Sequence, residues 1–158
     1  MPQIPHHCLH ARTLVVLEHL DRPTQHTRRL LTRQFRRLGL LSGGDGPDRR
    51  RAEEALLIAS ELVGNACRHS PGPTRLTSHW HPGTRRLTLA VSDPSSRPPR
   101  RKPPEERGAD GGYGILLIEI LSQYWTAVPH PDGGKTVVVS LDFPPPASHP
   151  EGRPHASE

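Results

Sequence analysis

The chain has 158 residues, the length of one domain with little room for a second core. Hydrophobic residues make up 32% of it, aromatic residues 4%, and the formal net charge is +5. Its longest apolar run covers only residues 55–59, whereas a membrane span needs about 20 apolar residues. The N-terminus lacks the apolar segment of a signal peptide, and two cysteines cannot make a disulfide framework. We therefore predict a soluble, cytoplasmic protein.

Prolines are concentrated in segments that hold almost no large apolar side chains. Such segments bury too little apolar surface to offset the entropy lost on ordering. We therefore predict a flexible N-terminal tail over residues 1–12, one globular domain over 13–143 and a flexible C-terminal tail over 144–158. A further proline-rich segment, residues 95–108, interrupts the domain.

The first half of the domain predicts one strand and two helices. The β-branched run Thr13–Leu17 indicates an edge strand. Apolar residues at helical spacing predict a helix that begins near Pro23 and is closed by Gly39. A second apolar stripe predicts a helix that is capped by Asp48 and runs to about His69.

The second half predicts two hairpins separated by a helix. Arg75–His81 and Arg85–Ser92 alternate like paired strands across a short turn, and Tyr124–Val128 and Lys135–Leu141 do the same. An apolar helix begins after Gly111–Gly112. The resulting order, β-α-α-β-β-α-β-β, predicts an α/β two-layer sandwich, with a mostly antiparallel mixed sheet and helices on one face.

The second predicted helix carries a carboxylate and a carboxamide on one face. Glu61 and Asn65 are four residues apart, about one turn of helix. The amide oxygen is a hard ligand that suits Mg²⁺, which is commonly shared with phosphates, and the carboxylate could accept a proton. A solvated helix face explains the same pair, so this spacing alone leaves both interpretations open.

Two further clusters fit the binding of a nucleotide. Asp93 ends an apolar strand, where its carboxylate could accept a hydrogen bond from an exocyclic amine or simply cap the loop. Gly111–Gly114 precedes a helix, and glycines at a helix N-terminus let the backbone approach a phosphate. In contrast, Gly134–Thr136 is not a Walker loop, because Pro129 stands where that pattern needs glycine and a strand follows.

With these three clusters in this order along the chain, the sequence resembles the histidine-kinase-like ATPase superfamily. Within that superfamily it resembles the bacterial anti-sigma-factor serine/threonine kinases and related regulatory ATP-binding proteins. The resemblance covers about residues 24–143. The matching segments are Glu61–His69, Val91–Asp93 with the loop after it, Gly112–Leu116, and Gly134–Val137. It implies a Bergerat-type ATP-binding fold, ATP and Mg²⁺ as cofactors, and an ATP lid over about residues 94–111.

The resemblance also implies a role for each matching residue. Glu61 would be the base that activates the phosphoryl acceptor, Asn65 would hold Mg²⁺, and Arg68 could reach a phosphate. Asp93 would bind the adenine amino group, with Thr136 supporting that contact through water. The remaining residues would line the phosphate side of the nucleotide: Gly112, Tyr113, Gly114 and Ile115.

The implied activity is transfer of the ATP γ-phosphate to Ser or Thr of an antagonist protein, with partner switching in transcription control. The implied partners are a sigma factor, an anti-sigma antagonist, or both, and a homodimer is also implied. A catalytically weak, nucleotide-gated binding module stays open as an alternative, because Tyr113 replaces the arginine common between the two glycines.

The basic charge raises nucleic-acid binding as a third class. Arginines follow one face of the first predicted helix over residues 28–37, and residues 97–102 form a basic arm. However, the chain has no recognised reader motif and too few aromatic residues for a stacking platform. We therefore assign the arginine face to an acidic protein partner. We assign no metal to the histidines of the N-terminal tail or to His79 and His81.

Overall fold

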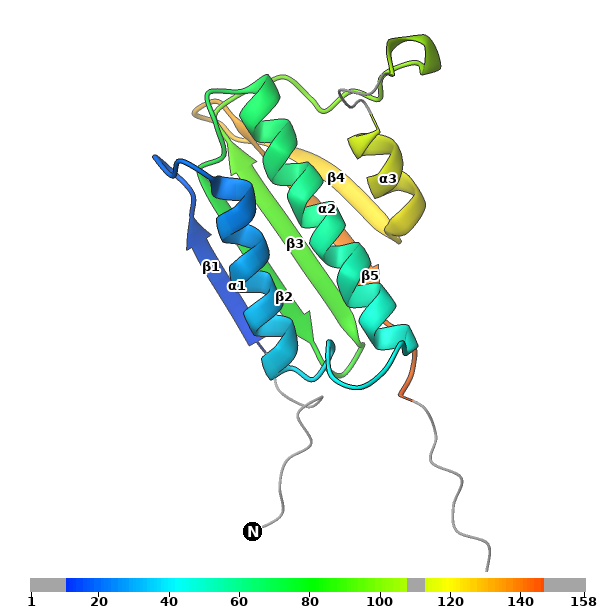
Figure 1. Cartoon of the computed structure of the whole chain (residues 1–158). Coiled ribbons are helices and arrows are strands. Elements are labelled where there is room, and N and C mark those ends of the chain that lie inside the picture. The colour runs from blue at the N-terminus through cyan, green and yellow to red at the C-terminus, as the bar shows by residue number, and fades with distance from the viewer. Residues whose placement is uncertain (1–10, 108–112, 147–158) are drawn as a thin grey trace, which may run out of the picture.

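The computed structural model describes residues 11–107 and 113–146 (Figure 1). Most of both predicted tails and the end of the predicted lid therefore lie outside the described residues. The elements follow one another as β1 (Ala11–Val16), α1 (Pro23–Arg37), α2 (Pro47–His69), β2 (Arg75–His81), β3 (Arg86–Asp93), the 3₁₀ helix η2 (Pro104–Glu106), α3 (Gly114–Leu121), β4 (Tyr124–Pro129) and β5 (Lys135–Asp142). The predicted order of strands and α-helices is confirmed, and η2 is an addition within the lid.

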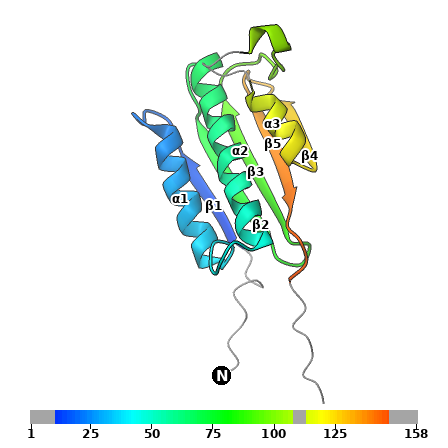
Figure 2. The same cartoon turned by 45° about the vertical axis from the view of Figure 1, so that its right-hand side comes forward.

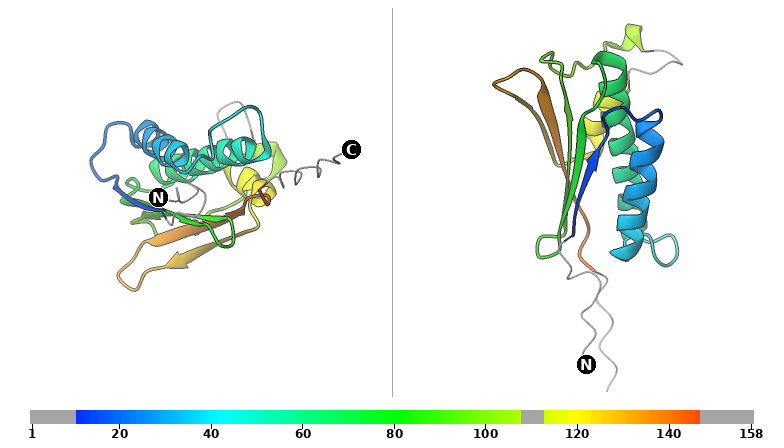
Figure 3. Two further views of the ribbon diagram at one scale, coloured as in Figure 1. Left: turned by 90° about the horizontal axis from the view of Figure 1, so that it is seen from below. Right: turned by 90° about the vertical axis from the view of Figure 1, so that its left-hand side faces the viewer.

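The five strands form one sheet in the order β1-β2-β3-β5-β4. All four pairings are antiparallel, so the prediction of a mostly antiparallel sheet is confirmed. The helices cover one face of this sheet and leave the other face open (Figures 2 and 3). The molecule is thus the two-layer sandwich that the order of elements predicts.

The core lies between the helices and the covered face of the sheet. Leu31 and Phe35 of α1 and Ile58 of α2 are fully buried, as are Trp80 of β2 and Leu89 of β3. Because strand residues alternate between the two faces, β5 buries every second side chain from Lys135 onward. A chain with few apolar residues therefore still builds one continuous core, since its apolar residues occur at the spacing that each element needs.

Asp48 does not cap α2, contrary to the prediction. The N-cap residue is Gly46, which makes no side-chain hydrogen bond, and Pro47 begins the helix. Asp48 lies within the first turn, and its two carboxylate oxygens accept hydrogen bonds from Nη2 of Arg85 at 2.6 and 2.8 Å. Arg85 precedes β3, so this ion pair joins the start of α2 to the β2–β3 turn.

Candidate functional site

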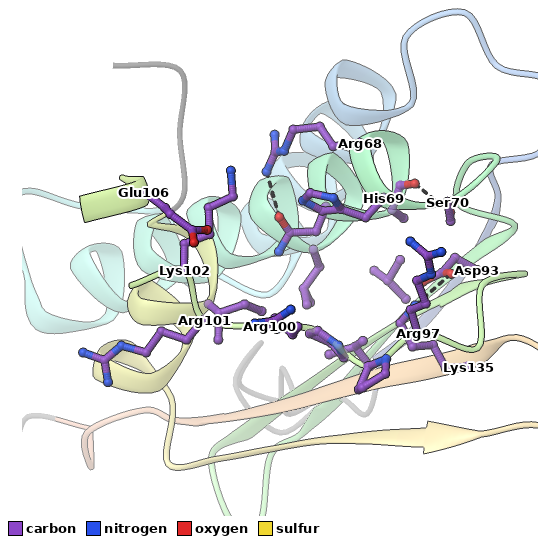
Figure 4. A pocket seen from close by; sticks show the side chains of 18 of the residues that line it. Arg68, His69, Ser70, Asp93, Arg97, Arg100, Arg101, Lys102, Glu106 and Lys135 are labelled. Carbon is purple, nitrogen blue, oxygen red and sulfur yellow. Dashed lines mark hydrogen bonds and ion pairs between the residues drawn. The ribbon is translucent and has the colours of Figure 1, made fainter. Parts of the chain in front are cut away.

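Three segments that are far apart in the sequence meet at one end of the sandwich: the C-terminal half of α2, the end of β3 and the start of α3 (Figure 1). A cavity of about 560 Å³ lies between them and the described part of the lid, residues 94–107. Its charged and polar lining residues are Asn65, Arg68, His69, Ser70, Asp93, Arg97, Arg100, Arg101, Lys102, Glu106 and Lys135 (Figure 4).

The α2 side of the site holds the predicted carboxylate–carboxamide pair. Arg68 donates from Nη2 to Oδ1 of Asn65 at 2.8 Å, and the same nitrogen lies 3.6 Å from Oε2 of Glu61. One guanidinium therefore contacts both side chains, because the three residues share one face of the helix. Asn65 and Arg68 line the cavity, and Glu61 lies beside them.

The start of α3 packs directly against this pair. A Cβ atom added to Gly114 would lie 2.6 Å from Oε2 of Glu61 and 3.2 Å from Nδ2 of Asn65. Only glycine leaves room for both side chains at this distance. The structure thus brings Gly114, the last residue of the predicted glycine segment, to the Glu61–Asn65 pair. Gly114 begins α3, and unpaired N–H groups at the N-terminus of a helix attract anions.

The other residues of the glycine segment are placed differently. Ile115, which follows Gly114, is buried and lines the cavity. Tyr113 precedes α3; this residue is 47% exposed and does not line the cavity. Gly112 lies outside the described residues.

Asp93 lies at the bottom of the site, where the whole residue is only 5% exposed. Lys135 donates from Nζ to Oδ1 of Asp93 at 3.0 Å and to the carbonyl oxygen of Ser95 at 2.9 Å. The backbone N–H of Ser95 donates to the same Oδ1 at 2.8 Å. The start of β5 and the start of the lid therefore both hold the carboxylate of Asp93 in place.

The structure does not bring Thr136 to Asp93, and this corrects the sequence-based assignment. The hydroxyl of Thr136 lies 2.7 Å from Oγ of Ser92 and 2.7 Å from Nε2 of His130. Successive strand residues face opposite sides of a sheet, so Lys135 faces Asp93 and Thr136 faces away. The alternation of Lys135–Leu141 already carried this signal, because lysine falls on the same parity as the buried residues Val137, Val139 and Leu141.

The described part of the lid lines the cavity with cations. Arg97, Arg100, Arg101 and Lys102 all line it, and Nη1 of Arg101 lies 3.3 Å from Oε2 of Glu119 on α3. Together with Arg68 on α2, these side chains give the cavity a surplus of positive charge, which attracts a polyanionic ligand. The basic arm that the sequence indicates is thus part of this site.

The arrangement combines three chemical features in one cavity. A buried carboxylate can accept hydrogen bonds from an amine, a glycine-flanked helix N-terminus can approach an anion, and several cations surround the space between them. Apolar side chains from α2, β3 and β5 supply the surface that a flat ring would pack against: Leu62, Val91 and Val137. This combination fits a nucleotide carrying several phosphates.

The comparison with protein families agrees with the geometry. The model of the histidine kinase-like ATPase domain matches residues 22–141, so the chain belongs to this family. Membership in a family of ATPase domains implies that the chain binds ATP. The matched range begins just before α1 and ends within β5, and it includes every residue of the site described above.

A solved structure shares the fold. The crystal structure of the RsbU and RsbW domains of Rv1364c from Mycobacterium tuberculosis is similar to this chain with a TM-score of 0.59 and 16% sequence identity. The similarity covers 84% of this chain and 32% of that chain. At this identity the likeness shows the fold alone. A comparison with curated proteins found no matching sequence. None of the described helices is both long enough and apolar enough to span a bilayer.

Proposed function

We propose that the protein binds ATP with Mg²⁺ in this cavity and transfers the γ-phosphate to a Ser or Thr of an antagonist protein. The observation that carries the proposal is the contact of Gly114 with Glu61 and Asn65, beside the cavity that also holds Asp93. Adenine would lie against Asp93, and the phosphates would lie between the start of α3, Arg68 and the lid. The match of residues 22–141 to the model of a family of ATPase domains supports ATP as the ligand.

The residues present fit a magnesium ion that is shared with the nucleotide. Oδ1 of Asn65 is a hard oxygen ligand, and the carboxylate of Glu61 lies on the same helix face. The described residues hold no group of three or more His, Cys, Asp or Glu that could bind a metal ion. Phosphate oxygens and water would therefore complete the coordination, and the ion would neutralise charge on the phosphates.

The transfer step assigns Glu61 as the base. The acceptor hydroxyl oxygen forms a bond to the γ-phosphorus while the bond from that phosphorus to the β,γ-bridging oxygen breaks, and ADP leaves. Glu61 takes the hydroxyl proton. The protein contributes mainly by positioning the groups and by neutralising charge, as is general in phosphoryl transfer. Arg68 and the lid cations supply that charge.

One observation favours the alternative of a nucleotide-gated binding module with little turnover. Nη2 of Arg68 lies 3.6 Å from Oε2 of Glu61, so a guanidinium group already stands beside the carboxylate where an acceptor hydroxyl would have to approach. In this alternative, ATP closes the lid and changes the surface offered to a partner, while transfer stays slow. The two functions share the binding site and differ only in chemistry.

Binding and transfer can be tested separately. Calorimetry with Mg-ATP should detect binding that Asp93→Asn weakens by at least about tenfold, because the carboxylate accepts a hydrogen bond as a charged group. Absence of ATP binding by the native chain would refute the proposal. Labelled ATP incubated with purified anti-sigma antagonist domains should label Ser or Thr. Glu61→Ala should abolish that label, whereas Glu53→Ala, an exposed residue on the same helix, should leave it unchanged.

The partner surface that we propose is the arginine face of α1. Five arginines of this helix line a shallow hollow of about 480 Å³, and α1 contains no acidic residue: Arg28, Arg29, Arg33, Arg36 and Arg37. An acidic surface of a sigma factor or of an antagonist complements this face. The homodimer remains a prediction that sedimentation would test.

A further inference from the structure

The cavity contains a buried ion pair between Asp93 and Lys135, and the resemblance assigns no role to Lys135. Asp93 and Lys135 are 5% and 7% exposed, and Nζ of Lys135 lies 3.0 Å from Oδ1 of Asp93. Both residues line the cavity (Figure 4). A well-packed apolar pair would stabilise such a position equally well, because removing two charges from water costs about as much as their attraction returns. The pair therefore calls for an explanation in terms of a ligand.

The hydrogen bonds around this ion pair leave one N–H donor of Lys135 and one carboxylate oxygen of Asp93 without a partner among the described residues. A lysine ammonium has three N–H donors, and Lys135 uses two of them, on Oδ1 of Asp93 and on the carbonyl of Ser95. Both donors to the Asp93 carboxylate in the described part of the chain bind Oδ1. Among the described residues, the third N–H of Lys135 and the Oδ2 atom of Asp93 therefore have no partner, and they belong to two side chains in direct contact.

We propose that Lys135 is a specificity-determining residue that reads adenine together with Asp93. The Watson–Crick edge of adenine presents an amine donor beside the ring acceptor N1. Oδ2 of Asp93 accepts from the amine, and the third N–H of Lys135 donates to N1. The inference rests on the proposed ATP binding and adds a direct contact from the protein to N1.

The geometry around the pair keeps these two groups in position. Gly134 approaches so closely that an added Cβ would lie 2.6 Å from the carbonyl oxygen of Asp93. Ser95 is held through both its N–H and its carbonyl, by Asp93 and Lys135 respectively. A donor and an acceptor that are already held in place lose little entropy when the base binds, so they can discriminate between ligands.

The test compares ATP with 1-deaza-ATP, in which a C–H replaces N1 and the amine is retained. Calorimetry on the native chain should show that ATP binds about tenfold to a hundredfold more tightly, the value of one hydrogen bond to a charged group. In Lys135→Met the two nucleotides should bind with nearly equal affinity. Lys102→Met, which changes the other lysine lining the cavity, should weaken both nucleotides by the same factor and preserve the ratio.

Each outcome decides the inference. Equal affinity of the native chain for the two nucleotides would overturn the role of Lys135 while leaving the proposed ATP binding intact. A native ratio that survives in folded Lys135→Met would also overturn it. Failure of the native chain to bind ATP would overturn both proposals. Circular dichroism would show whether Lys135→Met folds. Even if it does not fold, the inference stays testable, because the comparison of the two nucleotides on the native chain uses no variant.

Discussion

Replacing Gly134 with alanine should destabilise the protein strongly and displace the backbone of Asp93 and Pro94. Gly134 has a φ of +86°, in the left-handed region that favours glycine. An added Cβ would lie 2.6 Å from the carbonyl oxygen of Asp93 and 3.0 Å from Cα of Pro94. Both are backbone atoms, so neither can turn aside as the end of a side chain could.

The size of the effect follows from two terms. A residue other than glycine in the left-handed region costs about 1–2 kcal/mol, and overpacking against fixed atoms costs about 1–3 kcal/mol. Their sum, about 2–5 kcal/mol, is a large part of the roughly 5–15 kcal/mol that stabilises a typical domain. Gly133 offers a matched control, because its φ is +91° and no atom lies within 4 Å of its added Cβ. Gly133→Ala should therefore cost only the first term.

Urea denaturation of both variants would measure the difference. We expect Gly134→Ala to lose about 1–3 kcal/mol more unfolding free energy than Gly133→Ala, with similar denaturant slopes. ATP affinity should also fall in Gly134→Ala, because the backbone of Asp93 must move. Equal losses of unfolding free energy in the two variants would refute the close approach of Gly134 to the backbone of Asp93 and Pro94. They would also refute the positioning of Asp93 by Gly134.

Three further predictions concern other parts of the molecule. Gly114→Ala would press on the flexible end of Glu61, so stability should change by less than about 1 kcal/mol while phosphoryl transfer falls at least about tenfold; native transfer rates would contradict this. Burial raises the pKa of the Cys67 thiol. In a variant that lacks the other cysteine, the rate of alkylation should therefore begin to rise at a higher pH than for an ordinary thiol, because only the thiolate reacts. The hydrogen bond from Arg86 lowers the pKa of Asp142, so its stabilisation should be lost as the pH falls below about 4, and Arg86→Met should flatten that acid-side loss in denaturation curves.

Much of the fold was predictable because the signals are local. The apolar spacing of α1 and α2 and the short hairpin turns define the elements and their order within a few residues. Helix capping was predicted less well. Asp48 has the residue type of a cap, yet its carboxylate binds Arg85 across the fold, and no local pattern reveals a partner so distant in sequence.

Some features of the candidate site were likewise predictable from local sequence patterns, and others were not. The sequence by itself determined that Glu61 and Asn65 share one face of a helix and that Asp93 ends an apolar strand, because the helical repeat and the local apolar pattern show both. Only the tertiary structure decided which residues meet. Gly114 contacts Glu61 because α3 packs beside α2, and Lys135 replaces Thr136 at Asp93 because strand pairing fixes which side chains face the cavity. Contacts between distant segments depend on register and packing, and these are properties of the whole folded chain.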